Sequence, residues 1–472
     1  MGIDCYQAVN LTSERIRTML HQDDEFKSTD DKSSHLLEVL QWLLSEISFA
    51  KPLHAQCSWT FNSLAMTALL WAWSVEATMS ERIGCAQRLT QHLQRSQKRT
   101  TSRQSFMEIL VRHSSYLKQQ LIECFRAHMS SFSKHWKIAG YVVFGIDGSD
   151  ISVPRTSSNQ VAFNTNGKSK HQKRKRITKQ NAHQKKQRDC PRILMTTLFH
   201  IGLGLPWAWR LGSKSDNERS QLLSMLSELP KNALVVGDAG FTGFEFLAKV
   251  VASGSEVIIR VGSNVKLIKK LGRFRVRDGI VHVWPDWAMK KNHSPLLFRL
   301  VVVNGGKHPV YLITSVLECN QLSDKQVAKI YTMRWDIELY HRNLKQTMGH
   351  RKLLSRSPAN ALVELEWIVL GYTAMMLYSV DELLDRQIDI RQISLAAVMR
   401  AFRQSARDYR HPKTDGPSLN ELISRALRDC YKRSKSKQSR NYPQRREHRT
   451  PKPPIILVAS KLQRTIFQSL PA

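Results

Sequence analysis

Four residues near position 340 combine a phenol, two cations and a carboxylate within a short stretch: Tyr331, Arg334, Glu338 and Lys345. If the stretch is one α-helix, at about 100° per residue, all four fall on a strip about 60° wide. Such a strip is suited to hold a metal ion beside a phosphate. The alternative is a solvated face with an Arg334–Glu338 pair, which would contribute only about 0.2–0.5 kcal/mol. A second, apolar stripe predicts that the adjacent face packs on a core; its members are Ile330, Met333, Ile337, Tyr340, Leu344 and Met348.

Two aspartates follow apolar runs that are typical of buried strands. Asp147 comes directly after Tyr141–Ile146, and Asp238 directly after Ala233–Gly237. Because ligands bind at the carboxyl ends of sheet strands, we expect both side chains to reach one crevice, with Glu338 beside them. Converging carboxylates repel one another unless cations neutralise them, and Mg²⁺ or Mn²⁺ suits oxygen ligands. The pattern therefore indicates a two-metal site for phosphoryl transfer, the alternative being that each aspartate merely caps a turn.

The composition predicts a polyanionic partner. The chain of 472 residues has a formal net charge of +33, and two segments, 168–192 and 432–452, are especially rich in Lys and Arg. Nucleic acid is the usual partner of such a chain, although a basic segment can also act only as a solubilising tail.

The seven cysteines contain no C-x-x-C pair, which argues against a zinc site or a disulfide framework. With no signal peptide or apolar span recognised, we expect a cytoplasmic, nucleoid-associated protein without membrane contact.

The pattern of apolar residues divides the chain into five predicted parts. Residues 1–136 read as a helical domain that is expected to bind DNA, and residues 137–255 as the first part of an α/β core that contains a basic loop at 156–191. Residues 256–322 read as an all-β insertion, and a helix beginning near Ser323 opens the second part of the core at 323–385. Residues 386–472 read as a helical and basic tail.

The three motifs resemble those of a known family. The stretch YTMRWDIELYHRNLK, which contains Tyr331, Arg334, Glu338 and Lys345, resembles the signature of the insertion-sequence transposases of the IS-four family. IDGS around Asp147 and GDAGF around Asp238 resemble the first and second catalytic motifs of that family. The resemblance covers roughly residues 137–385. It implies an RNase H-like catalytic core interrupted by an all-β insertion.

The resemblance also implies an activity, cut-and-paste DNA transposition. Asp147, Asp238 and Glu338 would hold two Mg²⁺ ions, which Mn²⁺ can replace. The transposon end would be cleaved, form a hairpin with the opposite strand, and be transferred into target DNA. Tyr331, Arg334 and Lys345 would contact phosphates. The implied partners are double-stranded DNA, as terminal inverted repeats and target, and a second copy of the chain in a homodimer on paired ends.

One departure from the family concerns base stacking. Relatives carry a tryptophan just before the last strand of the insertion, where it stacks on a flipped base, but this chain has Val310 and Tyr311 there. Tyr311 is the first candidate to stack instead, and Trp284 or Trp287 the next, the alternative for both tryptophans being buried packing. In the basic loop, a clamp on DNA phosphates is expected, with a solvated loop as the alternative; the residues are Lys173, Arg174, Lys175 and Arg176.

Two other functions remain open from the sequence. A metal-dependent nuclease would cleave DNA without transferring strands, and a catalytically inactive descendant would bind DNA as a repressor. The second is disfavoured because Asp147, Asp238, Glu338 and their cationic neighbours are all present.

Overall fold

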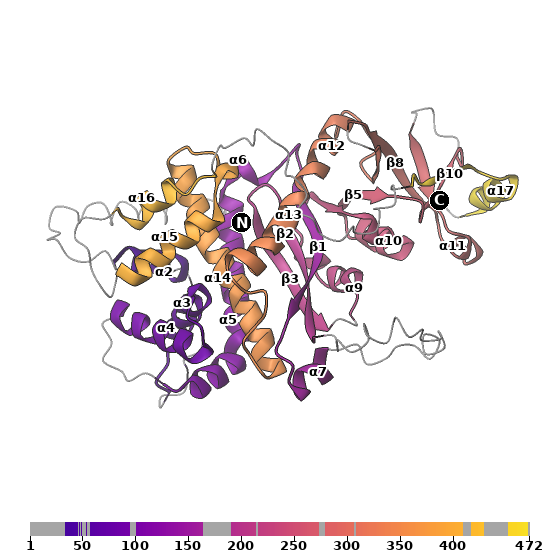
Figure 1. Cartoon of the computed structure of the whole chain (residues 1–472). Helices are drawn as coiled ribbons and strands as arrows, with labels where there is room; N and C mark the ends of the chain where they lie inside the picture. The colour runs from indigo at the N-terminus through magenta and orange to yellow at the C-terminus, as the bar shows by residue number, and fades with distance from the viewer. Residues whose placement is uncertain are drawn as a thin grey trace, which may run out of the picture.

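A ten-stranded mixed sheet runs from the middle of the protein to the end that carries β10 (Figure 1). The computed structural model describes residues 34–45, 47, 49, 53, 57–94, 101–163, 190–213, 216–272, 279–305, 308–408, 417–428 and 452–470. The strand order is β10-β6-β7-β8-β9-β5-β4-β1-β2-β3. The strands are β1 Val142–Ser152, β2 Arg192–His200, β3 Leu205–Ser213, β4 Ala233–Gly237, β5 Glu256–Val261, β6 Lys266–Lys269, β7 Ile280–Val283, β8 Leu296–Val303, β9 Val310–Thr314 and β10 Ile455–Val458.

The centre of the sheet combines parallel and antiparallel pairs. Strand β1 pairs antiparallel with β2 and parallel with β4, and β4 pairs parallel with β5. The predicted hairpin at Ile193–Ile201 and Pro206–Leu211 is confirmed as β2 and β3, and Gly204 in its turn has a φ of +71°, a conformation that glycine adopts without strain. Strand β9 then pairs antiparallel with β5. Residues 256–314 thus extend the same sheet.

Helices cover the faces and one end of this sheet. The longer ones in the described residues are α2 Ser34–Leu44, α3 Phe61–Trp73, α4 Met79–Leu93, α5 Arg103–Ser131, α10 Phe244–Ala252, α12 Asp324–Met333, α13 Trp335–Arg342, α14 Pro358–Asp385, α15 Leu395–Asp408 and α17 Lys461–Ser469. The shorter ones are α6 Ser133–Trp136, α7 Ser157–Phe163, α9 Glu218–Leu223, α11 Asp286–Lys290 and α16 Leu419–Ser424, the 3₁₀ turns η3 Leu226–Glu228, η4 Ala239–Phe241 and η6 Ile390–Gln392, and the π-turn η5 Asn343–Thr347. Helices α2, α3, α4, α15 and α16 lie together at the end opposite β10 and α17 (Figure 1).

Helix α14 is the central helix of the core. It packs on α5, α3 and β3. Its length and composition would suffice to cross a membrane, but 83% of its most apolar window is buried inside the protein. At its crossing with α3, a Cβ on Gly371 would lie 2.7 Å from the Cβ of Ala72, so only glycine allows this approach. The Trp73 indole donates to the Gly371 carbonyl there, at 2.8 Å.

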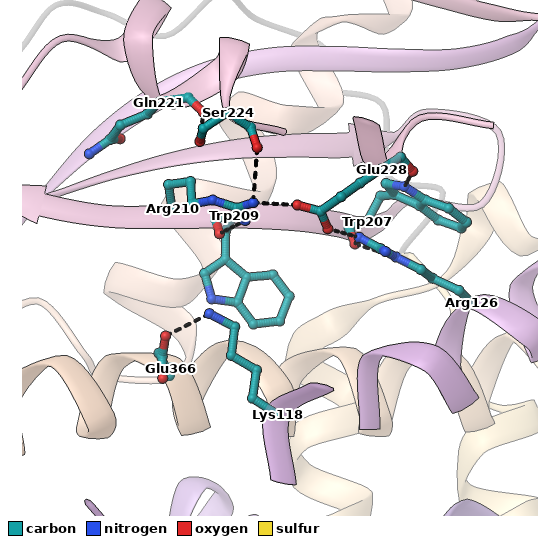
Figure 2. A network of polar contacts seen from close by, with 9 residues as sticks. All are labelled: Lys118, Arg126, Trp207, Trp209, Arg210, Gln221, Ser224, Glu228 and Glu366. Atoms are coloured by element: carbon teal, nitrogen blue, oxygen red, sulfur yellow. Dashed lines mark hydrogen bonds and ion pairs between the residues drawn. The ribbon is translucent and has the colours of Figure 1, made fainter. Parts of the chain in front are cut away.

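Ion pairs attach the helical layer to the far edge of the sheet (Figure 2). Arg126 of α5 and Arg210 of β3 both pair with Glu228, which lies in the turn after α9. Lys118, two turns earlier on α5, pairs with Glu366 of α14 at 2.6 Å. Helix α5 is thereby fixed at once to β3, to the turn before β4 and to α14.

Three predicted elements are wrong in detail. The single helix expected from Ser323 is divided into α12, α13 and the π-turn η5, with breaks at Arg334 and Asn343. The stretch expected to be all β contains α11, and residues 455–458 of the expected helical and basic tail form β10, which pairs with β6. A short strand pairing with a distant edge carries no local signal, because its partner lies almost two hundred residues away.

Candidate active site

Asp147 lies on β1, and Asp238 directly follows β4, the strand that pairs parallel with β1. Every β1–β4 pair joins residues 91 apart, from Val142 with Ala233 to Gly145 with Val236, and Asp147 and Asp238 are separated by the same 91 positions. Neighbouring strands are about 4.8 Å apart, so this register, continued by two residues, brings the two carboxylates together. The predicted convergence of the two aspartates agrees with this geometry.

The expectation that both strands end at their aspartate is wrong for β1. Strand β1 continues to Ser152 because β2 pairs with it throughout, and Asp147 lies opposite Thr197. The pairing with β4, by contrast, stops at Gly145. Asp147 therefore lies where the sheet opens between β1 and β4, while Asp238 caps the 3₁₀ turn η4, its Oδ1 accepting from the Gly240 N–H at 2.8 Å.

Helix α13 carries Glu338 onto the same part of the sheet, because α13 packs on β1. Arg334 donates from Nη2 to Oε1 of Glu338 at 2.6 Å, and its guanidinium lies 5.7 Å from the centre of the Tyr331 ring. The Arg334 charge also acts on Asp147, and the Tyr331 phenol is in the field of Asp238. Two members of the predicted strip, Arg334 and Tyr331, are therefore coupled electrostatically to the two aspartates.

Burial disfavours the ionised form of the carboxylates at this site. The pKa of Asp147 is raised to about 6, chiefly by burial. The Gly148 N–H and Arg334 oppose the rise, and the neighbouring charges of Asp238 and Glu218 contribute to it. The pKa of Glu218 on α9 is also raised, by burial and then by Asp238 and Asp150. A bound cation would relieve this crowding of carboxylates.

Glu218 is a carboxylate that the sequence analysis did not identify. A Cβ added to Gly148 would lie 2.1 Å from Oε1 of Glu218, so the Glu218 side chain occupies the space directly over the β1 backbone next to Asp147. Helix α9 begins at this residue, after its N-cap Asn217. Gly148 in IDGS indicates that another side chain approaches the strand at this point, because glycine leaves room for it. Only the fold identifies that side chain as Glu218.

His341 is a second neighbour of Asp147 for which the sequence analysis predicted no role. Its side chain is 6% exposed, and its Nε2 stands 4.0 Å from Oδ2 of Asp147. Burial, together with the charge of Lys345, lowers the pKa of His341 to about 3, so the imidazole is neutral. His341 lies one helical turn after Glu338 on α13. It therefore links the helix that carries Glu338 to the strand that carries Asp147.

Lys345 approaches the site from the π-turn. Burial lowers the pKa of its ammonium, and the charges of Asp150 and Asp147 oppose that change. A π-turn adds a residue to the helical turn and so redirects the side chains that follow. The single straight helix assumed on sequence would have placed Lys345 differently, although on the same side of the sheet.

The donor chemistry of the site fits a hard divalent cation. Asp147, Asp238 and Glu338 supply only oxygen, and the raised pKa of Asp147 shows uncompensated negative charge. Within the described residues, however, no three ligating side chains are already close enough to share one ion. Glu338 is bound instead by Arg334, through Oε1.

The structure gives the candidates for base stacking different environments. Tyr311 lines a cavity of about 300 Å³ together with Ala239, Arg260 and Lys452, directly beside the loop of Asp238. Trp284 is 3% exposed, and its indole donates to the His293 carbonyl at 2.7 Å, so it is a packing residue in this structure. Lys173, Arg174, Lys175 and Arg176 lie outside the described residues, and their role as a clamp stays a prediction.

These features define a class of α/β protein in which acidic side chains from a strand, a turn and a helix lie around the point where a mixed sheet opens. Residues 138–374, about half the chain, match the family model described as Transposase DDE domain. The chain belongs to that family, and it is a DDE transposase of the IS4 family.

Two curated relatives support the assignment. The chain is 25% identical over 252 residues to "Transposase InsG for insertion sequence element IS4" of Escherichia coli (strain K12), a match that covers 52% of each chain. It is 21% identical over 186 residues to "Putative transposase for insertion sequence element IS4SA" of Synechocystis sp., which covers 38% of this chain and 51% of the relative. The matches thus span about half the length of both relatives. Among solved structures, a piggyBac transposase synaptic complex with hairpin DNA aligns over 86% of each chain at 12% identity, but its TM-score of 0.37 is too low to establish a shared fold.

Proposed function

We propose that this protein catalyses cut-and-paste DNA transposition by phosphoryl transfer at Asp147, Asp238 and Glu338. The observation that supports the proposal is the parallel register of β1 and β4, which, continued past Gly145 and Val236, would bring the two aspartates near each other and near the helix of Glu338. We assign the core to the RNase H-like fold on the strand order β3-β2-β1-β4-β5, with β2 alone antiparallel to both its neighbours.

Asp147 and Asp238 would hold one divalent ion between them, and Glu338 would join them for a second. When bound, Mg²⁺ or Mn²⁺ would activate water and neutralise charge on the scissile phosphate. Arg334, released from Glu338, is then free to bind a phosphate oxygen through its planar guanidinium. Tyr331 and Lys345 lie on either side of it in the sequence and would fix the strand in line for attack.

Double-stranded DNA, as terminal repeat and as target, is the proposed substrate, and a homodimer on paired ends the proposed assembly, acting in the cytoplasm. Tyr311 is placed to receive a base turned out of the duplex, because its cavity opens beside the Asp238 loop and carries Arg260 and Lys452. This supports a hairpin step with a tyrosine in place of the usual tryptophan.

Labelled duplexes that carry the flanking ends of the gene test the proposal. With Mg²⁺, the protein should nick the end, form a hairpin and join the freed 3′-OH to target DNA. Asp147→Asn, Asp238→Asn and Glu338→Gln should each abolish cleavage while duplex binding is retained.

Asp150→Asn is the matched control, since Asp150 lies on the same strand but is paired with Arg192 at 3.5 Å. It should cleave within a few-fold of wild type. Cleavage without joined products would identify a nuclease, and binding without cleavage a repressor.

A further inference from the structure

A second groove leads away from the catalytic loop and includes none of the three proposed catalytic carboxylates. It has a volume of about 1060 Å³ and runs between α9 and α10 on one side and β6, β7 and α11 on the other. Its inner end is formed by Thr242 and Gly243, which closely follow Asp238. Asn264, also in its lining, donates to the Thr242 hydroxyl at 3.2 Å. We call this feature the α9–α11 groove.

The charge of the groove is positive. Four of its lining residues are cations, against the two acids Glu245 and Asp286; the cations are Arg219, Lys249, Lys266 and Lys290. No carboxylate in the described part of the chain forms an ion pair with any of the three lysines, and all three are exposed. Such unpaired ammonium groups along a groove favour a polyanion.

An aromatic side chain stands at the outer end of this groove. Trp287 on α11 is 39% exposed. Phe244 meets it edge to face at 5.5 Å and 87°, and His293 at 5.9 Å and 75°. Lys291 lies 5.9 Å from the ring centre. Phe244 and His293 pack against the indole at steep angles and Lys291 lies over one of its faces, so the ring is restrained before any ligand arrives. Little side-chain entropy therefore remains to be lost when a base stacks on the other face.

We propose that the α9–α11 groove binds a single-stranded segment of DNA, with one base stacked on Trp287 and the backbone phosphates on Lys249, Lys266 and Lys290. A fixed indole among cations matches single-strand binding surfaces, where each base offers a π-face. In an intact duplex those faces are already covered by neighbouring bases. The assignment of this strand to the flank opened beside Asp238 rests on the proposed function.

Binding of a fluorescein-labelled oligothymidine of about 12 nucleotides, followed by anisotropy in EDTA, tests the groove without any metal-dependent step. Trp287→Ala should weaken single-strand binding by about 5- to 150-fold and leave binding of a duplex of the same length nearly unchanged. Trp287→Phe should keep most of the affinity. The Lys249→Ala/Lys290→Ala double variant should reduce the slope of log K against log salt by roughly 1.4.

Two matched controls separate the groove from general charge and aromatic content. Trp335→Ala removes another exposed indole, 56% exposed on α13, and Lys325→Ala/Lys329→Ala removes two cations of α12. Both should bind oligothymidine as wild type does, and thermal melting should show every variant folded. A 5-iododeoxyuridine oligonucleotide should crosslink to Trp287.

Equal loss for single strand and duplex would overturn the proposal, and so would an unchanged affinity in Trp287→Ala. Because these assays contain no metal, their outcome is independent of whether the protein cleaves transposon ends. A protein that binds single strands at Trp287 but cleaves nothing would overturn the proposed function and leave the groove standing.

Discussion

At the scale of single residues, ionised Asp147 destabilises the metal-free folded protein, and a bound cation would remove this destabilisation. Burial raises its pKa from 3.8 to about 6, so the ionised form is less stable in the folded protein than in the unfolded chain. In metal-free protein, stability is therefore lost as the pH rises through about 6, and the difference of roughly two units corresponds to about 3 kcal/mol.

Asp147→Asn should consequently stabilise the metal-free protein at pH 8 by up to about 3 kcal/mol and have almost no effect at pH 4. Denaturant unfolding of both proteins in EDTA between these pH values measures the difference. With Mg²⁺ present the order should reverse, because only the carboxylate gains from the ion. A constant difference across the pH range would mean that Asp147 is not buried as described.

His341 belongs to the same scale. If its imidazole orients Asp147, His341→Phe should fill the same space yet weaken the binding of Mn²⁺ by about 10- to 100-fold, as loss of a partner of a metal ligand does. His341→Gln, which keeps a donor near the Nε2 position, should retain most of the affinity. Calorimetric titration of the metal reports this without reference to cleavage. Equal losses in both variants would point to packing alone.

At the scale of elements, the contact between β1 and α9 sets the shape of the site. A Cβ at Gly148 would overlap the Glu218 side chain, so Gly148→Ala should displace that side chain from its half-buried position and destabilise the protein by about 1–3 kcal/mol. Glu218→Ala added to it should restore most of that loss, since the obstructing atoms are gone. Thermal melting of the single and double variants measures the coupling.

Gly145→Ala is the matched control on the same strand. A Cβ there would meet Ile201 at 3.5 Å, which is an ordinary contact, and should be tolerated. If Gly148→Ala melts like Gly145→Ala, the Glu218 side chain does not occupy the place described.

The helical stretch that carries Glu338 was predicted only in part from the local sequence pattern. Its start at Ser323 was predicted from the cap, and the structure has a capping box there with Gln326. The break at Arg334 and the π-turn at Asn343–Thr347 were not predicted, because an angular plot assumes uniform 3.6-residue turns.

At the scale of the whole molecule, Glu228 joins the helical layer to the sheet through Arg126 and Arg210 (Figure 2). Burial acts to raise the pKa of Glu228, but the hydrogen bonds from the two arginines outweigh it and leave the pKa below its usual value. The stabilisation is therefore complete above the unfolded pKa of about 4.5 and lost as the pH falls below it.

Glu228→Ala should destabilise the protein by about 1–3 kcal/mol at pH 7 and by much less near pH 3, because it leaves two guanidinium groups half-buried without a carboxylate. Hydrogen exchange should show the loss in α5 and β3 before α10. Glu245→Ala, an exposed acid on α10, is the control and should change neither stability nor exchange. Uniform loosening throughout the molecule would contradict a local role in joining the two layers.

By itself, the sequence determined the types of the catalytic candidates and the elements that hold them, because strand and helix periodicities and capping residues act over a few positions. Only the tertiary structure decided what surrounds Asp147: the shared register with Asp238, the Glu218 carboxylate over Gly148, and the His341 ring. It also decided that β10 returns to the sheet edge and that Trp287, not Trp284, is exposed. Such neighbours come from distant segments, and no local pattern records which of them will meet.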